Sequence, residues 1–220
     1  MTIPTRREAA RLLLSLDPPG WSLQHACAVA DIAGWLARAI AGNGTSCNVH
    51  AVEAAALLHD VDKIPAGRVA GARHGEGSAA WLAAHGMPEL GPLVRDHPVS
   101  RYADEADTER LATAPLEARI IAYADKRAGQ RLESMADRFA SWRRRYPSGP
   151  GEPVLARGDR PPRGPGWDDE TAARVEVRAA TLEREICGLA SVAPADVRRL
   201  RWARRALRAA ATHSARGGPT

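Results

Sequence analysis

Apolar residues recur at intervals of three and four between residues 21 and 41, which is the spacing of one face of a helix. The residues on this face are Val29, Ile32, Leu36 and Ile40. His25 lies four residues before Val29, so its ring is expected on the buried side of the same helix, where it must have a partner. Because Ala and Leu dominate over Val, Ile and aromatic residues, we expect an almost entirely helical, all-α fold.

Turn signals separate this helix from several others. Asn48 is placed to cap a helix over residues 49–63, which is apolar nearly all round and is therefore expected at the centre of the fold. The other predicted helices run over residues 75–86 and 88–97 and, after a polar loop, from Pro115 to Trp142 as one helix of about eight turns.

Pro and Gly mark the domain boundaries. Residues 147–167 are rich in both and predict a flexible or extended connector. The expected organisation is a helical bundle over residues 1–146, this connector, a basic helical extension over residues 168–212 and a disordered tail over residues 213–220.

The first residues of the chain and its three cysteines bear on cellular location and redox chemistry. The first residues form neither a signal peptide nor a membrane span, which favours a cytoplasmic location with no membrane partner. Cys27, Cys47 and Cys187 are odd in number and lack a CxxC pairing, so we interpret them as small packing residues.

The formal net charge of +5 is concentrated in two basic stretches, Trp142 to Tyr146 and Arg198 to Arg208. Such runs can bind phosphate-rich partners, although a solvated helix face is the favoured explanation. One hypothesis is therefore a nucleic-acid- or nucleotide-binding module that uses the basic C-terminal helix, although no base-reading motif is recognisable.

The pair His59-Asp60 follows an apolar helical segment, where neighbouring imidazole and carboxylate groups can reach one divalent cation. The dipeptide alone is a weak signal. It gains weight because His25 precedes it on a buried helix face and Asp125 follows it in the segment IIAYADKRAGQR. Nitrogen and oxygen ligands of this kind suit transition metals such as Mn, Fe, Co, Ni or Zn better than Ca or Mg alone.

This order of His, His-Asp and Asp resembles the HD-domain phosphohydrolase superfamily, whose members use those four side chains as metal ligands on a helical bundle. The resemblance covers roughly residues 20 to 145. It is carried by the segments WSLQHACAVADIAGWLA, AAALLHDVDKIP, RHGEGSAAWLAAHGMPELGPLVRDH and IIAYADKRAGQR. It implies a metal-dependent phosphohydrolase in which metal-activated water cleaves a phosphoester or phosphoanhydride of a phosphorylated, nucleotide-type small molecule.

His74 and His97 match family segments that each carry an extra ligand histidine. The resemblance therefore implies two ions with Asp60 between them, Fe or Mn being favoured and Co, Ni, Zn or Mg remaining possible. Alternatively, His74 is a loop histidine and His97 is a histidine favoured at a helix C-terminus by the helix dipole. His50 and His85 match no family position and are interpreted as surface or capping residues.

Three cations are candidate substrate-binding groups. Lys63 matches the lysine of the family's HD-x-x-K pattern and lies four residues after His59, so we expect it on the same helix face, where it and Asp60 would act in catalysis. Arg131 matches the arginine of the family's AD-K-x-x-x-x-R segment, and Arg127 lies between it and Asp125. The alternatives are an exposed lysine and surface pairs of the arginines with Glu133 and Asp137. Asp62 is either a proton-transfer group or polar surface, the latter being favoured.

Within the superfamily the pattern is nearest to small bacterial stand-alone HD proteins, which include symmetrical diadenosine tetraphosphate hydrolases. The chain departs from them after His97, where it reads PVSRYADEAD, and in its connector and C-terminal helices. Cyclic-dinucleotide phosphodiesterases carry a Gly-Tyr-Pro signature that is replaced here by VDKIP. A degenerate scaffold without metal is disfavoured because every ligand position is filled.

Overall fold

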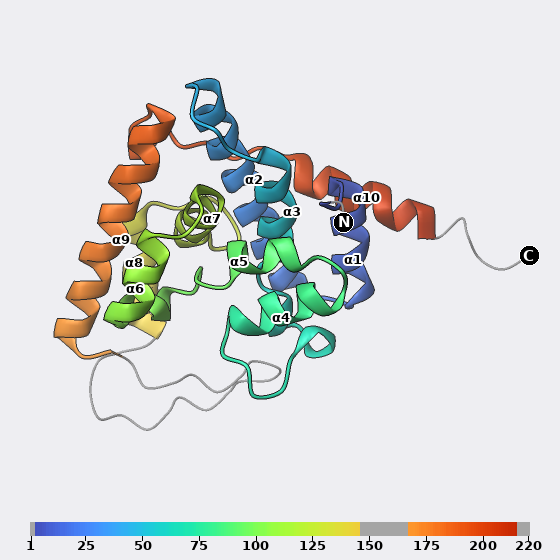
Figure 1. The fold of residues 1–220 in the computed structure, drawn as a ribbon, viewed down its shortest axis with the longest axis horizontal. Coiled ribbons are helices and arrows are strands. Elements are labelled where there is room, and N and C mark those ends of the chain that lie inside the picture. The colour runs from blue at the N-terminus through green and yellow to red at the C-terminus, as the bar shows by residue number, and fades with distance from the viewer. Residues whose placement is uncertain (1–2, 146–166, 215–220) are drawn as a thin grey trace, which may run out of the picture.

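A computed structural model describes residues 3–145 and 167–214, and within these ranges the chain is all-α, as predicted (Figure 1). In chain order the α-helices are α1 (Arg6–Ser15), α2 (Gly20–Gly42), α3 (Val49–Leu58), α4 (Glu76–Ala84), α5 (Gly91–Val94), α6 (Glu105–Ala112), α7 (Leu116–Lys126), α8 (Met135–Arg145), α9 (Asp169–Ala190) and α10 (Trp202–Ser214). Short 3₁₀ turns connect them: η1 (Val61–Lys63), η2 (Pro65–Gly67), η3 (Pro88–Leu90), η4 (Val99–Ala103) and η5 (Pro194–Asp196).

Helices α2 and α3 form the centre of the bundle. They pack against each other, and both contact α7, while α2 also contacts α9 and α10. Every residue of α3 from Ala51 to Leu58 is buried, which agrees with a segment that is apolar nearly all round. The many alanines of α2 and α3 allow such close approach of helix backbones, and burial of their apolar surface stabilises the fold.

Helix boundaries follow local chemistry where the capping residue is present. The side chain of Asn48 accepts a hydrogen bond from the backbone N–H of Ala51 at 3.0 Å, which confirms the predicted cap of α3. Gly86, with φ of 78°, follows the C-cap of α4 and supplies the predicted helix stop.

Two expected helices are shorter than predicted, and one was missed. The helix predicted over residues 49–63 ends at Leu58 and continues as η1, and the segment 88–97 contains η3 and the single turn α5. The predicted polar loop before Pro115 contains η4 and α6, whose cap is Asp104: its side chain accepts from the N–H of Asp107 at 2.9 Å. Few apolar residues mark this amphipathic segment, so its periodicity was weak.

The prediction of one continuous helix from Pro115 to Trp142 is wrong. The chain leaves the helix after Lys126, and a turn over residues 127–134 separates α7 from α8. Two hydrogen bonds close this turn at 2.8 Å, one from the N–H of Glu133 to the carbonyl of Arg127 and one from Nε of Arg127 to the carbonyl of Glu133. Apolar spacing continues across the break because both helices pack on the core, so periodicity alone could not reveal it.

The C-terminal helices complete the core. Helix α9 packs against α7, α2 and η4, and α10 packs against α1 and α2 (Figure 1). Val175, Ile186, Trp202 and Ala210 are buried in the same apolar cluster as α2 and α3. One core therefore runs through both the predicted bundle and the predicted extension, while nearly all of the predicted connector and most of the predicted tail lie outside the described residues.

Among the described helices, none combines the length and apolar character needed to cross a membrane. Cys27 and Cys187 are buried in the core and Cys47 is half-buried, each as a free thiol. These positions agree with the interpretation of the cysteines as packing residues.

Because α9 belongs to the core, Ile186→Ala should lower the free energy of unfolding by about 2–5 kcal/mol through lost burial and a cavity. Urea denaturation followed by circular dichroism measures this. The matched control is Val177→Ala on the same helix, where the side chain is 65% exposed and the change should stay within about 0.5 kcal/mol. Equal stability of both variants would contradict a core role for α9.

Candidate metal centre

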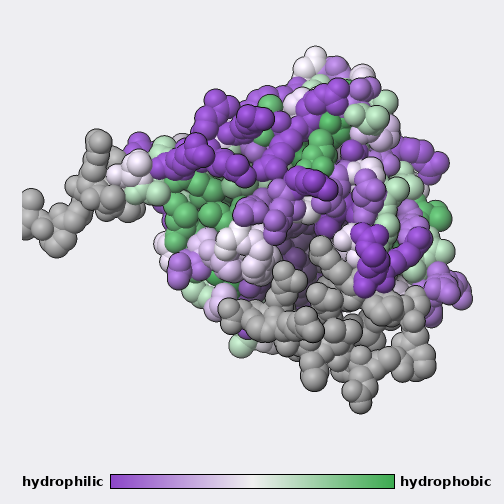
Figure 2. All heavy atoms as spheres, turned by 180° about the vertical axis from the view of Figure 1, so that it is seen from behind, coloured by the Kyte–Doolittle hydropathy of each residue, from purple (hydrophilic) through white to green (hydrophobic). Residues whose placement is uncertain are grey.

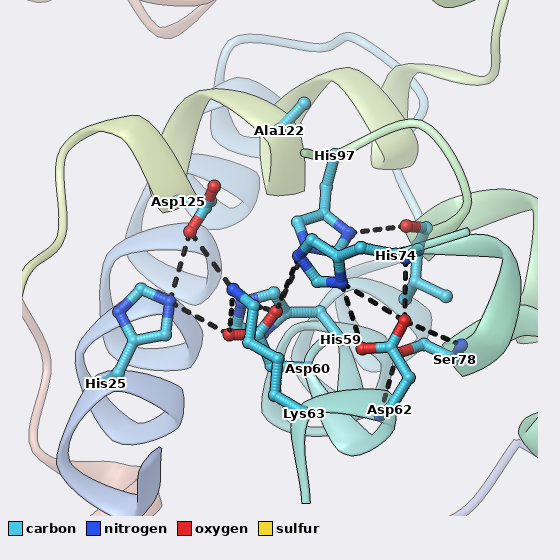
Figure 3. A network of polar contacts seen from close by, with 12 residues as sticks. His25, His59, Asp60, Asp62, Lys63, His74, Ser78, His97, Ala122 and Asp125 are labelled. Atoms are coloured by element: carbon cyan, nitrogen blue, oxygen red, sulfur yellow. Dashed lines mark hydrogen bonds and ion pairs between the residues drawn. The ribbon is translucent and has the colours of Figure 1, made fainter. Parts of the chain in front are cut away.

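Six side chains from distant parts of the chain meet in the interior of the bundle (Figure 3). His25 comes from α2, Asp125 from α7, and His59 with Asp60 from the end of α3. His74 precedes α4, and His97 follows α5. The structure thus brings together all six residues that the sequence analysis named as metal ligands.

The carboxylates of Asp60 and Asp125 lie at the centre of this cluster. The Nε2 atoms of His97, His74 and His59 lie 3.2, 3.4 and 3.5 Å from Oδ1 of Asp60. On the other side, Nε2 of His25 lies 3.1 Å from Oδ1 of Asp125 and 3.4 Å from Oδ2 of Asp60. Asp60 therefore connects the two halves of the cluster.

Among the described residues, three overlapping groups could each hold a metal ion, and within each group the potential ligand atoms lie within 4.8 Å of one another. They are His25, His59 and Asp125; His59, Asp60 and His97; and Asp60, Asp62 and His74. Asp60 belongs to two of these groups and has two carboxylate oxygens.

Each histidine ring is fixed by its other nitrogen. The Nδ1 atoms of three rings donate to backbone carbonyls: His25 to Gly129 at 2.8 Å, His59 to Ala56 at 2.8 Å and His97 to Val94 at 2.5 Å. Nδ1 of His74 lies 3.0 Å from a carboxylate oxygen of Asp62. Because a carbonyl only accepts, Nδ1 of the first three rings carries a proton, and Nε2 is the atom that each ring turns to the cluster.

The environment of His59 tests whether a metal ion fits this cluster. Its side chain is fully buried, and its Nε2 is a buried polar atom without a hydrogen-bond partner among the described residues. A buried polar atom of this kind costs free energy unless something satisfies it. A divalent cation fits this position, because nitrogen and carboxylate oxygen are the donors around it.

The electrostatics of the cluster also favour added positive charge. Burial opposes ionisation of Asp60, but His59 and Lys63 outweigh it and hold the pKa of this carboxyl well below its ordinary value. Burial lowers the pKa of His97 to about 4, so this ring is neutral near neutral pH although its Nε2 faces Asp60. Burial opposes protonation of His59 as well, yet Asp60 and Asp125 raise its pKa. Asp60 and Asp125 therefore favour positive charge beside them.

Lys63 contacts the cluster from the η1 turn and not from a helix face shared with His59. Its Nζ donates to Oδ2 of Asp60 at 2.9 Å, and its side chain is 38% exposed. The expectation that it shares a helix face with His59 is wrong, because α3 ends at Leu58 and the η1 turn carries the lysine back. Tight 3₁₀ geometry makes Asp60 and Lys63 neighbours at i and i+3.

Asp62 lies in the cluster, although the sequence analysis favoured polar surface over a proton-transfer role for it. The interpretation as polar surface is wrong: its side chain is only 8% exposed. Besides His74, it accepts hydrogen bonds from the backbone N–H groups of Gly75 at 2.7 Å and Ser78 at 3.3 Å. A carboxylate behind a ligand ring fixes the ring's orientation and raises its basicity. No local signal in the sequence distinguishes this aspartate from a surface one.

Two buried cationic side chains donate hydrogen bonds to the backbone of clustered histidines. Nζ of Lys126, which is fully buried, donates to the carbonyl of His97 at 2.6 Å and lies 4.4 Å from the centre of the Tyr102 ring. Arg101 donates to the carbonyl of His74 at 3.0 Å and pairs with Asp107 at 3.2 Å. The missed segment of η4 and α6 therefore helps to position His74.

The two predicted substrate-binding arginines point elsewhere. The guanidinium of Arg127 donates to Tyr123, Glu183 and the carbonyl of Pro194, so it joins α7 to α9. The side chain of Arg131 is 84% exposed and lies 3.8 Å from Glu133, as the ion-pair alternative expected. Neither contacts the histidine cluster.

His85 also lies apart from the cluster, as expected. Its ring stacks on Trp81, and its Nδ1 donates to the Trp81 carbonyl at 2.8 Å. It is a helix-end histidine without ligand geometry.

Comparison with known proteins gives one match. The family model of the HD domain matches residues 22–129, a range that includes all six clustered residues. Searches of curated proteins and of solved structures found no match.

His97→Ala and His74→Ala should each lower the amount of metal bound per chain while leaving the helical circular dichroism signal unchanged, because each removes one nitrogen from the Asp60 side of the cluster. Elemental analysis after reconstitution with Mn²⁺ or Fe²⁺ measures this. His85→Ala is the matched control, since it removes a histidine with the same kind of Nδ1 contact outside the cluster. Unchanged metal content in His74→Ala and His97→Ala would return both residues to a structural role.

Proposed function

We propose, from the match of residues 22–129 to the HD-domain family, that this chain is a metal-dependent hydrolase of a phosphoester or phosphoanhydride in a nucleotide-type substrate. The HD domain family is generally one of phosphohydrolases. The observation that carries the proposal is the unsatisfied Nε2 of His59 inside a cluster of imidazoles and carboxylates.

The ligand set divides into two parts. His25, His59 and Asp125 would hold one divalent cation, and His74 and His97 would hold a second, with Asp60 shared between them. Such a cation lowers the pKa of bound water, so that a nucleophile is available near neutral pH. Fe or Mn is favoured for both positions, and Co, Ni, Zn or Mg would also accept these donors.

Exposure indicates where the substrate enters. His59 and His97 are sealed in the core, whereas the side chains of His74 and Lys63 are 32% and 38% exposed. A phosphate group can therefore reach the cluster from the side of these two residues. The ammonium group of Lys63, held by Asp60, lies on this path and would bind a phosphoryl oxygen.

The remaining groups keep the ligands in place. Asp62 orients His74, and Lys126 and Arg101 hold the backbone of His97 and His74. Pre-organised ligands of this kind need little rearrangement when charge develops on the transferring phosphoryl. We assign substrate binding to Lys63 alone, since the contacts of Arg127 and Arg131 lie elsewhere.

The direct test is a hydrolysis screen on protein reconstituted with Mn²⁺, Fe²⁺, Co²⁺ or Mg²⁺. The substrates should include bis(4-nitrophenyl) phosphate, nucleoside mono- and triphosphates and a dinucleoside polyphosphate. We expect metal-dependent release of phosphate or nucleotide that chelation with EDTA abolishes. In H₂¹⁸O, the label should appear on the phosphoryl group that is transferred to water, because water attacks phosphorus. Absence of hydrolysis across the whole screen by metal-loaded protein would contradict the proposal.

Lys63→Ala should retain metal binding but lower the turnover number by about a hundredfold, which is typical for loss of a pre-organised electrostatic stabiliser. Steady-state kinetics on the best substrate of the screen, with metal content measured in parallel, provide the readout. Arg68→Ala is the control, because it removes the same charge from an exposed position five residues along the chain. Turnover equal to that of the unaltered protein would exclude Lys63 from phosphate binding.

A further inference from the structure

A second concentration of positive charge lies apart from the metal centre, along α10 and the segment before it. Five arginines line a cavity of about 670 Å³ there. They are Arg199, Arg201, Arg204, Arg205 and Arg208. None of them belongs to the histidine cluster. Cavities of a few hundred Å³ are the usual size of small-molecule sites.

The positive charge of this cavity is poorly neutralised. The only acidic residue in its lining is Asp31, which is buried and already accepts from Nε of Arg199 at 3.3 Å and from the N–H of Ala203 at 3.0 Å. Among the described residues, Arg201, Arg204 and Arg208 have no acidic partner. Guanidinium groups in this state attract an anion, and phosphate matches their donor geometry.

An apolar pocket of about 260 Å³ adjoins the basic cavity and shares Arg204 and Arg208 with it. Its other lining residues are Leu14, Leu23, Gln24, Cys27, Leu207 and Ala211. Figure 2 shows the same arrangement on the surface, with hydrophilic side chains gathered over α10 beside a hydrophobic patch. The combined site thus offers cations next to an apolar recess.

We propose that this site binds a nucleoside polyphosphate, with its phosphates on the arginines and its base in the apolar pocket. The arginines converge on one cavity, whereas a nucleic-acid backbone would need a longer track of phosphate contacts. A flat aromatic base suits a recess bordered by guanidinium groups, because cations stack on aromatic faces. The proposal is separate from the proposed hydrolytic function and requires no turnover.

Isothermal titration of the full chain in EDTA, with ATP and inorganic triphosphate as probes, tests this assignment. ATP should bind more tightly than triphosphate, because only ATP carries a base for the apolar pocket. The double variant Arg204→Ala/Arg208→Ala should weaken ATP binding by about tenfold or more, since it removes the two guanidiniums common to both pockets.

The matched control is Arg144→Ala/Arg184→Ala, which removes the same charge from exposed positions on α8 and α9 and should leave ATP affinity unchanged. Equal ATP affinity in the pocket variant and the control variant would overturn the proposal, and so would equal affinity for ATP and triphosphate. Tight, steeply salt-dependent binding of a 20-nucleotide RNA that ATP does not displace would replace it with a nucleic-acid surface. None of these results depends on hydrolysis, so the proposed function is tested independently.

Discussion

The structure is organised around two carboxylates that are buried in an apolar bundle. Asp60 and Asp125 are almost inaccessible, and charge in such surroundings is costly unless opposite charge or hydrogen-bond donors surround it. The carboxylates are surrounded by four imidazole rings and the ammonium group of Lys63. A contact at Nδ1 fixes the orientation of each ring. Helices α2 and α7 and the residues that follow α3 each contribute a group to this polar centre.

The sequence predicts those parts of the site that depend on the order of residues along the chain or on local chemistry. The order of His25, His59, Asp60 and Asp125 identifies a family pattern, and Asn48 marks the start of α3 by its own chemistry. Apolar spacing predicts α2 almost to the residue, because that helix is surrounded by core. Convergence of the ligands in space could be inferred only through the resemblance, since residues a hundred positions apart have no local reason to meet.

The parts that the sequence hides depend on tertiary contacts. The role of Asp62 follows from the contact of its carboxylate with Nδ1 of His74. The role of Arg127 follows from its hydrogen bonds to Glu183 and Pro194, which lie more than fifty residues later in the chain. The break between α7 and α8 is invisible because a helical apolar pattern continues through it. In each case a distant segment decides the role of a residue whose own neighbourhood is uninformative.

The turn over residues 127–134 contacts two regions of the molecule. Its Gly129 carbonyl fixes the ring of His25, and the next carbonyl, that of Gln130, accepts from Arg199 at 3.2 Å in the lining of the basic cavity. Two adjacent peptide groups therefore contact His25 of the candidate metal centre and Arg199 of the basic cavity. A substitution that shifts the backbone of this turn would displace an anchor of both regions at once.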